Sequence, residues 1–185
     1  MILHKLQLRI ALVGLPGSGK STIGRHLAKR LSLGFTDSDL VIEQRLGCSI
    51  REYFERNGEP AFRVIEQDVI DELTQRTDCV ISTGGGAVTN QNNRDNLKTR
   101  CKTIYLHCAP EEIFRRLRHD QNRPLLQVAD PFQKLQELYA ERDPLYREAA
   151  HFVIQTGKPS VSNMVNLILA QIDLDGMPPA RNALD

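Results

Sequence analysis

The chain of 185 residues contains no tryptophan, and aromatic side chains make up only 5% of it. It has no excess of charge of either sign, because 24 Lys and Arg residues are balanced by 23 Asp and Glu residues, giving a formal net charge of +1. A chain without a strongly basic balance has no overall field that attracts nucleic acid or an anionic membrane. We therefore expect no nucleic-acid partner, and any anion-binding site must be local.

The four cysteines, Cys48, Cys79, Cys101 and Cys108, include no C-x-x-C pair. Isolated thiols of this kind are typical of reduced cytosolic proteins and argue against a zinc site. No apolar run approaches the ~18 residues of a membrane span, and residues 1–9 lack the apolar stretch of a signal peptide. The sequence thus predicts a cytoplasmic protein with no membrane partner, and we take a monomer as the default.

Short apolar runs alternate with segments of helical periodicity along most of the chain. The runs at residues 8–13, 35–36, 79–82, 103–106 and 152–155 read as strands of a parallel sheet. Parallel strands joined by helices connect in a right-handed sense and place ligands at their carboxyl ends. We therefore expect an α/β fold with three layers, α/β/α, around a five-stranded parallel sheet.

The length of the chain fits one compact domain, which we place at residues 1–172 and end with a helix over residues 161–172. The segment from His119 to Asp130 has no clear period, and an internal segment of this kind is usually a lid or a binding loop. We place a mobile lid at about residues 119–131. Residues 173–185 are predicted to form a disordered tail.

Two helix boundaries are marked by capping residues. Ser49-x-x-Glu52 is a capping box that opens a helix ending near Gly58, and Pro60 suits the first turn of the next helix. Gly34 is predicted to stop the helix that follows the first strand. The helices are thus short and closely spaced.

Residues 14–21 read Gly-Leu-Pro-Gly-Ser-Gly-Lys-Ser and match the P-loop pattern G-x-x-x-x-G-K-[ST]. The motif follows a predicted buried strand and opens a predicted helix, so that loop amides and the helix N-terminus converge on one anion. Lys20 would reach the β- and γ-phosphates of ATP, and the Ser21 hydroxyl would bind Mg²⁺. The alternative is a structural glycine turn. The predicted nucleotide-binding residues of this segment are Gly17, Ser18, Gly19, Lys20, Ser21 and Thr22.

Asp37-Ser38-Asp39 follows the second predicted strand, at the same edge of the sheet as the P-loop. Mg²⁺ takes oxygen ligands and keeps several waters, so one or two carboxylates suffice. We assign Asp37, with Ser21, to one Mg²⁺ ion and Asp39 to the acceptor. The alternative for either aspartate is a cap on the following helix at residues 40–45. These residues predict a P-loop kinase or NTPase that uses ATP.

Six motifs occur in the order and approximate spacing of shikimate kinases, and the chain resembles this family from about Ile10 to about Pro159. The resemblance implies transfer of the ATP γ-phosphoryl group to the 3-hydroxyl of shikimate, giving shikimate 3-phosphate and ADP, a step of aromatic amino-acid and chorismate biosynthesis. Two alternatives stay open. One is another P-loop kinase, for gluconate or nucleoside monophosphates, and the other is a non-catalytic nucleotide-binding regulator. The motifs are the P-loop, Asp37-Ser38-Asp39, Phe62-Arg63-x-x-Glu66, Gly84-Gly85-Gly86-Ala87-Val88, Arg123-Pro124-Leu125-Leu126 and Pro144-Leu145-Tyr146-Arg147.

The resemblance also implies roles for individual residues. Arg63 and Arg147 would hold the shikimate carboxylate, which suits guanidinium groups, although alone they read as surface arginines, Arg63 in a solvated ion-pair face. Asp39 would accept the proton of the 3-hydroxyl, and Arg123 on the lid would neutralise charge on the transferring phosphoryl group. The predicted catalytic residues are therefore Lys20, Asp39 and Arg123, with Arg116 and Pro159 near the adenine and Gly84, Gly85 and Gly86 along the substrate. The alternative for the glycines is a flexible turn.

Overall fold

The computed structural model of the chain describes residues 8–117, 128–157 and 160–176. Five parallel strands form one sheet in the order β2-β3-β1-β4-β5. The central strand β1 pairs Ile10 with Val80 on one side and with Lys102 on the other. The predicted five-stranded parallel sheet is confirmed. The strands are β1 (Arg9–Val13), β2 (Gly34–Asp37), β3 (Cys79–Ser82), β4 (Lys102–His107) and β5 (Phe152–Gln155).

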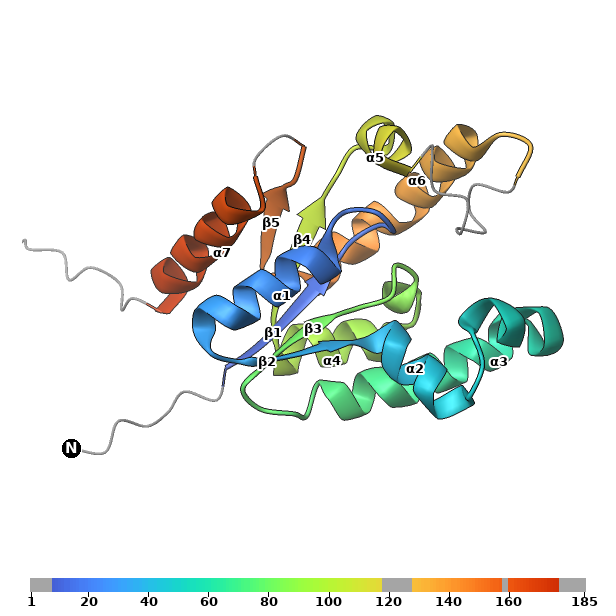
Figure 1. Cartoon of the computed structure of the whole chain (residues 1–185), viewed down its shortest axis with the longest axis horizontal. Coiled ribbons are helices and arrows are strands. Elements are labelled where there is room, and N and C mark those ends of the chain that lie inside the picture. Colours follow the sequence, from blue (N-terminus) through green and yellow to red (C-terminus); the bar gives the residue numbers. More distant parts are fainter. Residues whose placement is uncertain (1–7, 118–127, 158–159, 177–185) are drawn as a thin grey trace, which may run out of the picture.

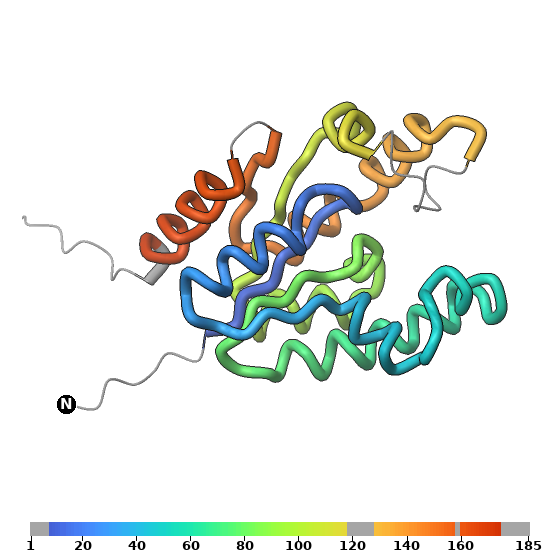
Figure 2. Tube along the Cα trace, viewed as in Figure 1, coloured from blue at the N-terminus to red at the C-terminus, as the bar shows by residue number. Residues whose placement is uncertain are grey.

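Helices cover both faces of this sheet (Figures 1 and 2). Alternate residues of a strand point to opposite faces, and in β1 Ile10 and Leu12 pack with α1 and α7, whereas Ala11 and Val13 pack with α3, α4 and α6. The expected three-layer α/β/α fold is therefore confirmed. The helices are α1 (Lys20–Leu31), α2 (Ser38–Leu46), α3 (Ile50–Leu73), α4 (Gln91–Arg100), α5 (Pro110–Leu117), α6 (Pro131–Ala149) and α7 (Val161–Gly176), with the short 3-10 helix η1 (Ala87–Thr89).

The helix α3 begins and breaks where the sequence predicts. The Ser49 side chain accepts a hydrogen bond from the Glu52 N–H at 3.2 Å and caps the helix. Gly58 has non-helical backbone angles, φ 80° and ψ 170°, which only glycine adopts without strain. The helix therefore consists of two parts, and Pro60 lies in the first turn of the second part.

Two predicted boundaries were wrong. The helix α1 is capped at Ser32 rather than stopped by Gly34, because Ser32 takes up the left-handed conformation (φ 55°) and its N–H bonds to carbonyls of the last turn. Gly34 instead opens β2. The helix α7 includes residues 173–176, which the sequence assigned to a tail, because no helix-breaking residue precedes Gly176. Residues 177–185 of that tail, and residues 118–127 of the predicted lid, lie outside the described residues.

All four cysteines are free thiols, as predicted. Cys79, Cys101 and Cys108 are buried, whereas Cys48 is partly exposed in the turn between α2 and α3. Burial raises the pKa of Cys79, and it raises the pKa of Cys101 to about 12. Among the residues that the structure describes, no helix has the length and apolar character needed to cross a membrane.

Candidate active site

The P-loop connects β1 to α1 at the carboxyl edge of the sheet. Gly17 and Gly19 have φ values of 84° and 95°, in the left-handed region that favours glycine. Gly19 is the N-cap of α1, and no described side chain caps this helix, so its first amides are available to an anion. Lys20 is buried and donates hydrogen bonds to the carbonyls of Gly14 at 2.7 Å and Leu15 at 2.9 Å. The Lys20 ammonium group thus lies against the backbone of the P-loop.

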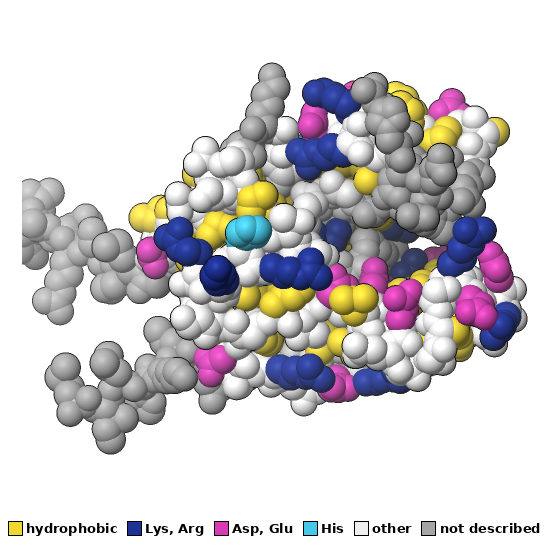
Figure 3. Space-filling model, in the orientation of Figure 1, with side chains coloured by type: hydrophobic (Ala, Val, Ile, Leu, Met, Phe, Trp, Pro, Cys, Tyr) yellow, Lys and Arg dark blue, Asp and Glu magenta, His cyan; other side chains and the backbone are white. Residues whose placement is uncertain are grey.

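A cavity of about 380 Å³ lies beside the P-loop. Figure 3 shows the molecule hollowed on the right of this view, with acidic and basic side chains along the rim. The lining comes from the segments that follow β1, β2 and β3, whose carboxyl ends meet at one edge of the sheet. The structure therefore brings together most residues predicted for the phosphates, the metal and the acceptor. They are Gly17, Gly19, Lys20, Ser21, Thr22, Asp37, Asp39 and Gly85.

Asp37 joins the cap of α2 to the P-loop. Its Oδ1 accepts from the Asp39 N–H at 3.0 Å, and its Oδ2 accepts from the Ser21 hydroxyl at 2.7 Å. Asp37 thus caps α2, the role considered as the alternative, and it also lines the cavity beside the P-loop. A hydroxyl and a carboxylate are oxygen donors of the kind that Mg²⁺ takes. Within residues 8–117, 128–157 and 160–176 there is no group of three or more His, Cys, Asp or Glu that could hold a metal, so a metal here would depend on few protein ligands.

Asp39 lies in the first turn of α2 and contributes a partly buried carboxyl to the cavity. Burial raises the pKa of Asp39 to about 6, the carboxylates of Asp37 and Glu66 add to the rise, and Lys20 opposes it. A Cβ atom on Gly84 would lie 2.5 Å from Asp39 Oδ1, so the carboxyl fits only because residue 84 is glycine. A carboxyl with this pKa is ionised at neutral pH and is well matched to accept a proton.

The glycine loop, residues 84–86, joins β3 to η1 and packs tightly on its neighbours. A Cβ atom on Gly85 would lie 2.7 Å from the Pro16 side chain, and one on Gly86 would lie 2.5 Å from both Nη atoms of Arg63. These approaches are possible only without side chains. The loop is therefore a close-packed junction between the P-loop and α3 rather than the flexible turn considered as the alternative.

Tyr146 anchors the glycine loop to α6. This side chain is fully buried, and its hydroxyl donates a hydrogen bond to the Gly85 carbonyl at 2.6 Å. Burial raises the pKa of Tyr146, and the nearby Arg142 guanidinium opposes the rise. Tyr146 is therefore a neutral donor that fixes the loop beside the cavity.

Replacing Tyr146 with phenylalanine should remove this anchor without changing the packing of the ring. We expect the free energy of unfolding to fall by about 1–3 kcal/mol, because a buried carbonyl loses its donor. Urea denaturation followed by circular dichroism measures the change. An unchanged unfolding midpoint would show that the Gly85 carbonyl does not need the hydroxyl.

Arg63 and Glu66 form an ion pair on the inner face of α3. Arg63 Nη1 donates to Glu66 Oε2 at 2.7 Å, and the two side chains are only 19% and 1% exposed. The alternative of a solvated ion-pair face is therefore wrong for Glu66. Burial raises the pKa of Glu66, and the charges of Arg63 and Arg142 oppose the rise. The charges of two guanidinium groups thus act on one buried carboxylate.

Arg147 does not belong to this group. Its side chain is 47% exposed, and its Nε donates to Asp143 Oδ2 at 2.8 Å. Arg142 is partly buried, and its Nε is a buried donor with no hydrogen-bond acceptor among the described residues. The second arginine beside Glu66 is therefore Arg142, one helical turn before Tyr146, and the expectation for Arg147 is corrected accordingly.

The sequence analysis assigned no role in the site to Arg142 or Glu66, although the sequence contains a pattern that indicates both. In a helix, residues that recur every three or four positions share one face. Arg142 continues the buried stripe of α6, and Glu66 continues that of α3, so both are charged residues at core positions. The buried residues of these stripes are Leu135, Leu138, Tyr146 and Ala149 in α6, and Phe62, Val69, Ile70 and Leu73 in α3.

Of the two residues predicted to lie near the adenine, Arg116 belongs to the described part of the chain. Its Nη2 donates to the Thr156 carbonyl at 2.7 Å, which holds α5 against the segment after β5. Pro159 and the predicted lid residue Arg123 lie outside the described residues.

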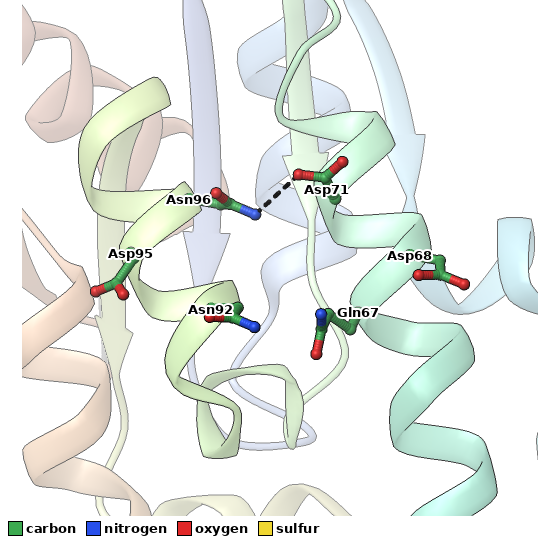
Figure 4. Close-up of a pocket in the computed structure, with 6 residues that line it drawn as sticks. All are labelled: Gln67, Asp68, Asp71, Asn92, Asp95 and Asn96. Carbon is green, nitrogen blue, oxygen red and sulfur yellow. Dashed lines mark hydrogen bonds between the residues drawn. The ribbon is translucent and has the colours of Figure 1, made fainter.

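A second hollow, of about 320 Å³, lies between α3 and α4 (Figure 4). Several of its side chains already form hydrogen bonds: Asp71 accepts from Arg100 at 2.8 Å and from Asn96 at 3.2 Å, and Gln67 accepts from Asn90 at 2.7 Å. None of the residues predicted for the site lines it. It is lined by Gln67, Asp68, Asp71, Asn92, Asp95 and Asn96.

Known proteins match this chain over nearly its whole length. The family model described as shikimate kinase matches residues 16–173. A shikimate kinase of Paracidovorax citrulli is 58% identical over 177 residues, which cover 94% of this chain and 96% of the relative. One of Ralstonia nicotianae is 51% identical over 176 residues, covering 94% and 93%.

Solved structures of the same name share the fold. The shikimate kinase from Acinetobacter baumannii in complex with shikimate has a TM-score of 0.90 and 44% identity, covering 94% of this chain and 97% of that one. The shikimate kinase from Aquifex aeolicus has a TM-score of 0.81 and 33% identity, covering 92% and 99%. Together with the P-loop beside the cavity, these matches show that the chain belongs to the shikimate kinase family.

Proposed function

We propose that this protein transfers the γ-phosphoryl group of ATP to the 3-hydroxyl of shikimate, which yields shikimate 3-phosphate and ADP. The observation that carries the proposal is a P-loop sharing one cavity with the partly buried Asp39 carboxyl, near two arginines whose charges act on Glu66. A phosphate cradle, a proton acceptor and a cationic pair match the phosphate donor, the hydroxyl and the carboxylate of the reactants. Identity with shikimate kinases supports the same substrate.

In this proposal the nucleotide binds along the P-loop. The amides from Gly17 to Thr22 and the Lys20 ammonium hold the phosphates, and Arg123 neutralises charge on the transferring group. Ser21 and Asp37 would hold one Mg²⁺ ion, which when bound neutralises phosphate charge. Arg116 and Pro159 lie along the adenine in this proposal.

The acceptor binds between Asp39 and the arginines. Arg63 and Arg142 hold the carboxylate, and the glycine loop lies along the ring. Asp39 orients the 3-hydroxyl and takes its proton while the oxygen forms its bond to the γ-phosphorus and the bond from that phosphorus to the β-phosphate oxygen breaks. Transfer is direct, and no phosphorylated protein side chain is formed.

The organisation of the protein completes the proposal. The chain up to the end of α7 at residue 176 acts as one kinase domain with a lid near residues 119–131, as a cytoplasmic monomer. Balanced charge and four unpaired thiols support these assignments.

A panel of acceptors tests the proposed function. ADP release is measured with Mg-ATP and, in parallel, shikimate, gluconate or a nucleoside monophosphate. We expect rapid release with shikimate alone. Release with gluconate or a nucleoside monophosphate instead would assign another P-loop kinase, and ATP binding without turnover of any acceptor would favour a nucleotide-binding regulator.

A further inference from the structure

All three nitrogen atoms of the Arg63 guanidinium group donate to carboxylates of its own helix. Its Nη1 donates to Glu66 at 2.7 Å. Its Nε and Nη2 both donate to one oxygen of Glu59, Oε1, at 3.0 Å and 2.6 Å. The Nε and Nη2 edge, which could bind a substrate carboxylate through both of its oxygens, is therefore occupied by a protein carboxylate.

The two glutamates hold Arg63 with very different strength. Glu66 is 1% exposed, so separating it from Arg63 would leave a buried carboxylate without its hydrogen-bonded partner. Glu59 is 59% exposed, and it directly follows the helix break at Gly58. Exposed ion pairs stabilise a protein by only about 0.2–1 kcal/mol. Glu59 is therefore the partner that another carboxylate can displace.

Arg63 itself has little freedom to turn towards a ligand. Its guanidinium lies so close to Gly86 that a Cβ atom there would be 2.5 Å from both Nη atoms. Its central carbon also lies 5.3 Å from the centroid of the Phe62 ring. A carboxylate that binds the Nε and Nη2 edge must therefore take the place of Glu59.

We propose that Glu59 is an internal competitor for the substrate carboxylate: it occupies the edge of Arg63 that the substrate needs, and productive binding displaces it. The inference rests on the proposed function and adds a residue that sets the affinity for the substrate. A ligand whose binding site is only partly available has its apparent affinity lowered by that fraction. Glu59 thus weakens the binding of every carboxylate to Arg63 by a common factor, and small carboxylates, which make no further contacts, are left only weakly bound.

The substitution Glu59→Gln removes the competing charge. We expect the KM for shikimate to fall about two- to fivefold, the range that corresponds to an exposed ion pair, with kcat and the KM for ATP nearly unchanged. Acetate, tested as a small carboxylate, should become a stronger inhibitor that competes with shikimate. Glu59→Ala, which removes the acceptor oxygens altogether, should lower the KM at least as far.

A matched control lies on the same helix. Glu55 is 64% exposed and bonds to Arg51 at 3.0 Å through the same four-residue spacing, and Glu55→Gln should leave the KM for shikimate unchanged. An unchanged KM in both Glu59 variants would show that there is no competition, and a raised KM would show that Glu59 instead positions Arg63. Either result overturns the inference, whereas absence of shikimate turnover by the unsubstituted protein would refute the proposed function.

Discussion

Asparagine in place of Asp39 is expected to lower kcat for shikimate phosphorylation by about 10²- to 10⁴-fold, the range typical of losing a general base. Asparagine keeps the shape of the side chain but cannot take the proton of the 3-hydroxyl. ATP binding, measured by calorimetry, should be nearly unchanged, because the P-loop does not depend on this carboxyl.

The same substitution should stabilise the protein at neutral pH. In the folded chain partial burial disfavours the charged form of Asp39, and the carboxylates of Asp37 and Glu66 disfavour it further. A higher unfolding midpoint together with lost turnover would show that the carboxyl is retained for chemistry. Asp68→Asn, at an exposed position of α3 outside the cavity, is the control and should change neither property. A kcat of Asp39→Asn close to that of the unsubstituted protein would remove Asp39 from the proposed mechanism.

Alanine in place of Arg142 is expected to lower kcat/KM for shikimate by about thirtyfold to several thousandfold. Loss of one partner of a desolvated charge pair costs roughly 2–5 kcal/mol, and Arg142 and Arg63 would share the substrate carboxylate. The KM for ATP should change little. Steady-state kinetics with shikimate varied at saturating ATP measure the effect.

Arg147→Ala is the matched control on the same helix. Arg147 is exposed and bonds to Asp143, so its removal should leave kcat/KM for shikimate nearly unchanged. The opposite pattern, with a large loss in Arg147→Ala and none in Arg142→Ala, would return the carboxylate role to Arg147.

Local patterns in the sequence determined much of the fold. The runs at residues 79–82 and 152–155 predict β3 and β5 with the bounds that the structure has, because short apolar segments between helices have few other ways to be buried. The P-loop and Asp37 could also be placed, since both directly follow strands and parallel strands end at one edge of the sheet.

The arginine pair depends on contacts between distant segments. Whether Arg142 or Arg147 faces α3 is decided by the rotation of α6 about its axis, which the packing of that helix on the sheet sets. The motif Pro144-Leu145-Tyr146-Arg147 contains only Arg147, and the motif alone does not show which face of α6 that residue takes. The glycine loop depends on distant segments in the same way. Each of its three glycines lies against a residue from another segment, and these residues are Asp39, Pro16 and Arg63.

The uneven burial of the thiols makes the natural chain suitable for labelling at one position. A maleimide reacts with thiolates, and burial disfavours both access and ionisation at Cys79 and Cys101. Cys48, partly exposed in the turn between α2 and α3, would take a fluorescent dye without any engineered cysteine. A dye there would sit next to the two helices that carry Asp39 and Arg63, and its emission could report on acceptor binding in real time.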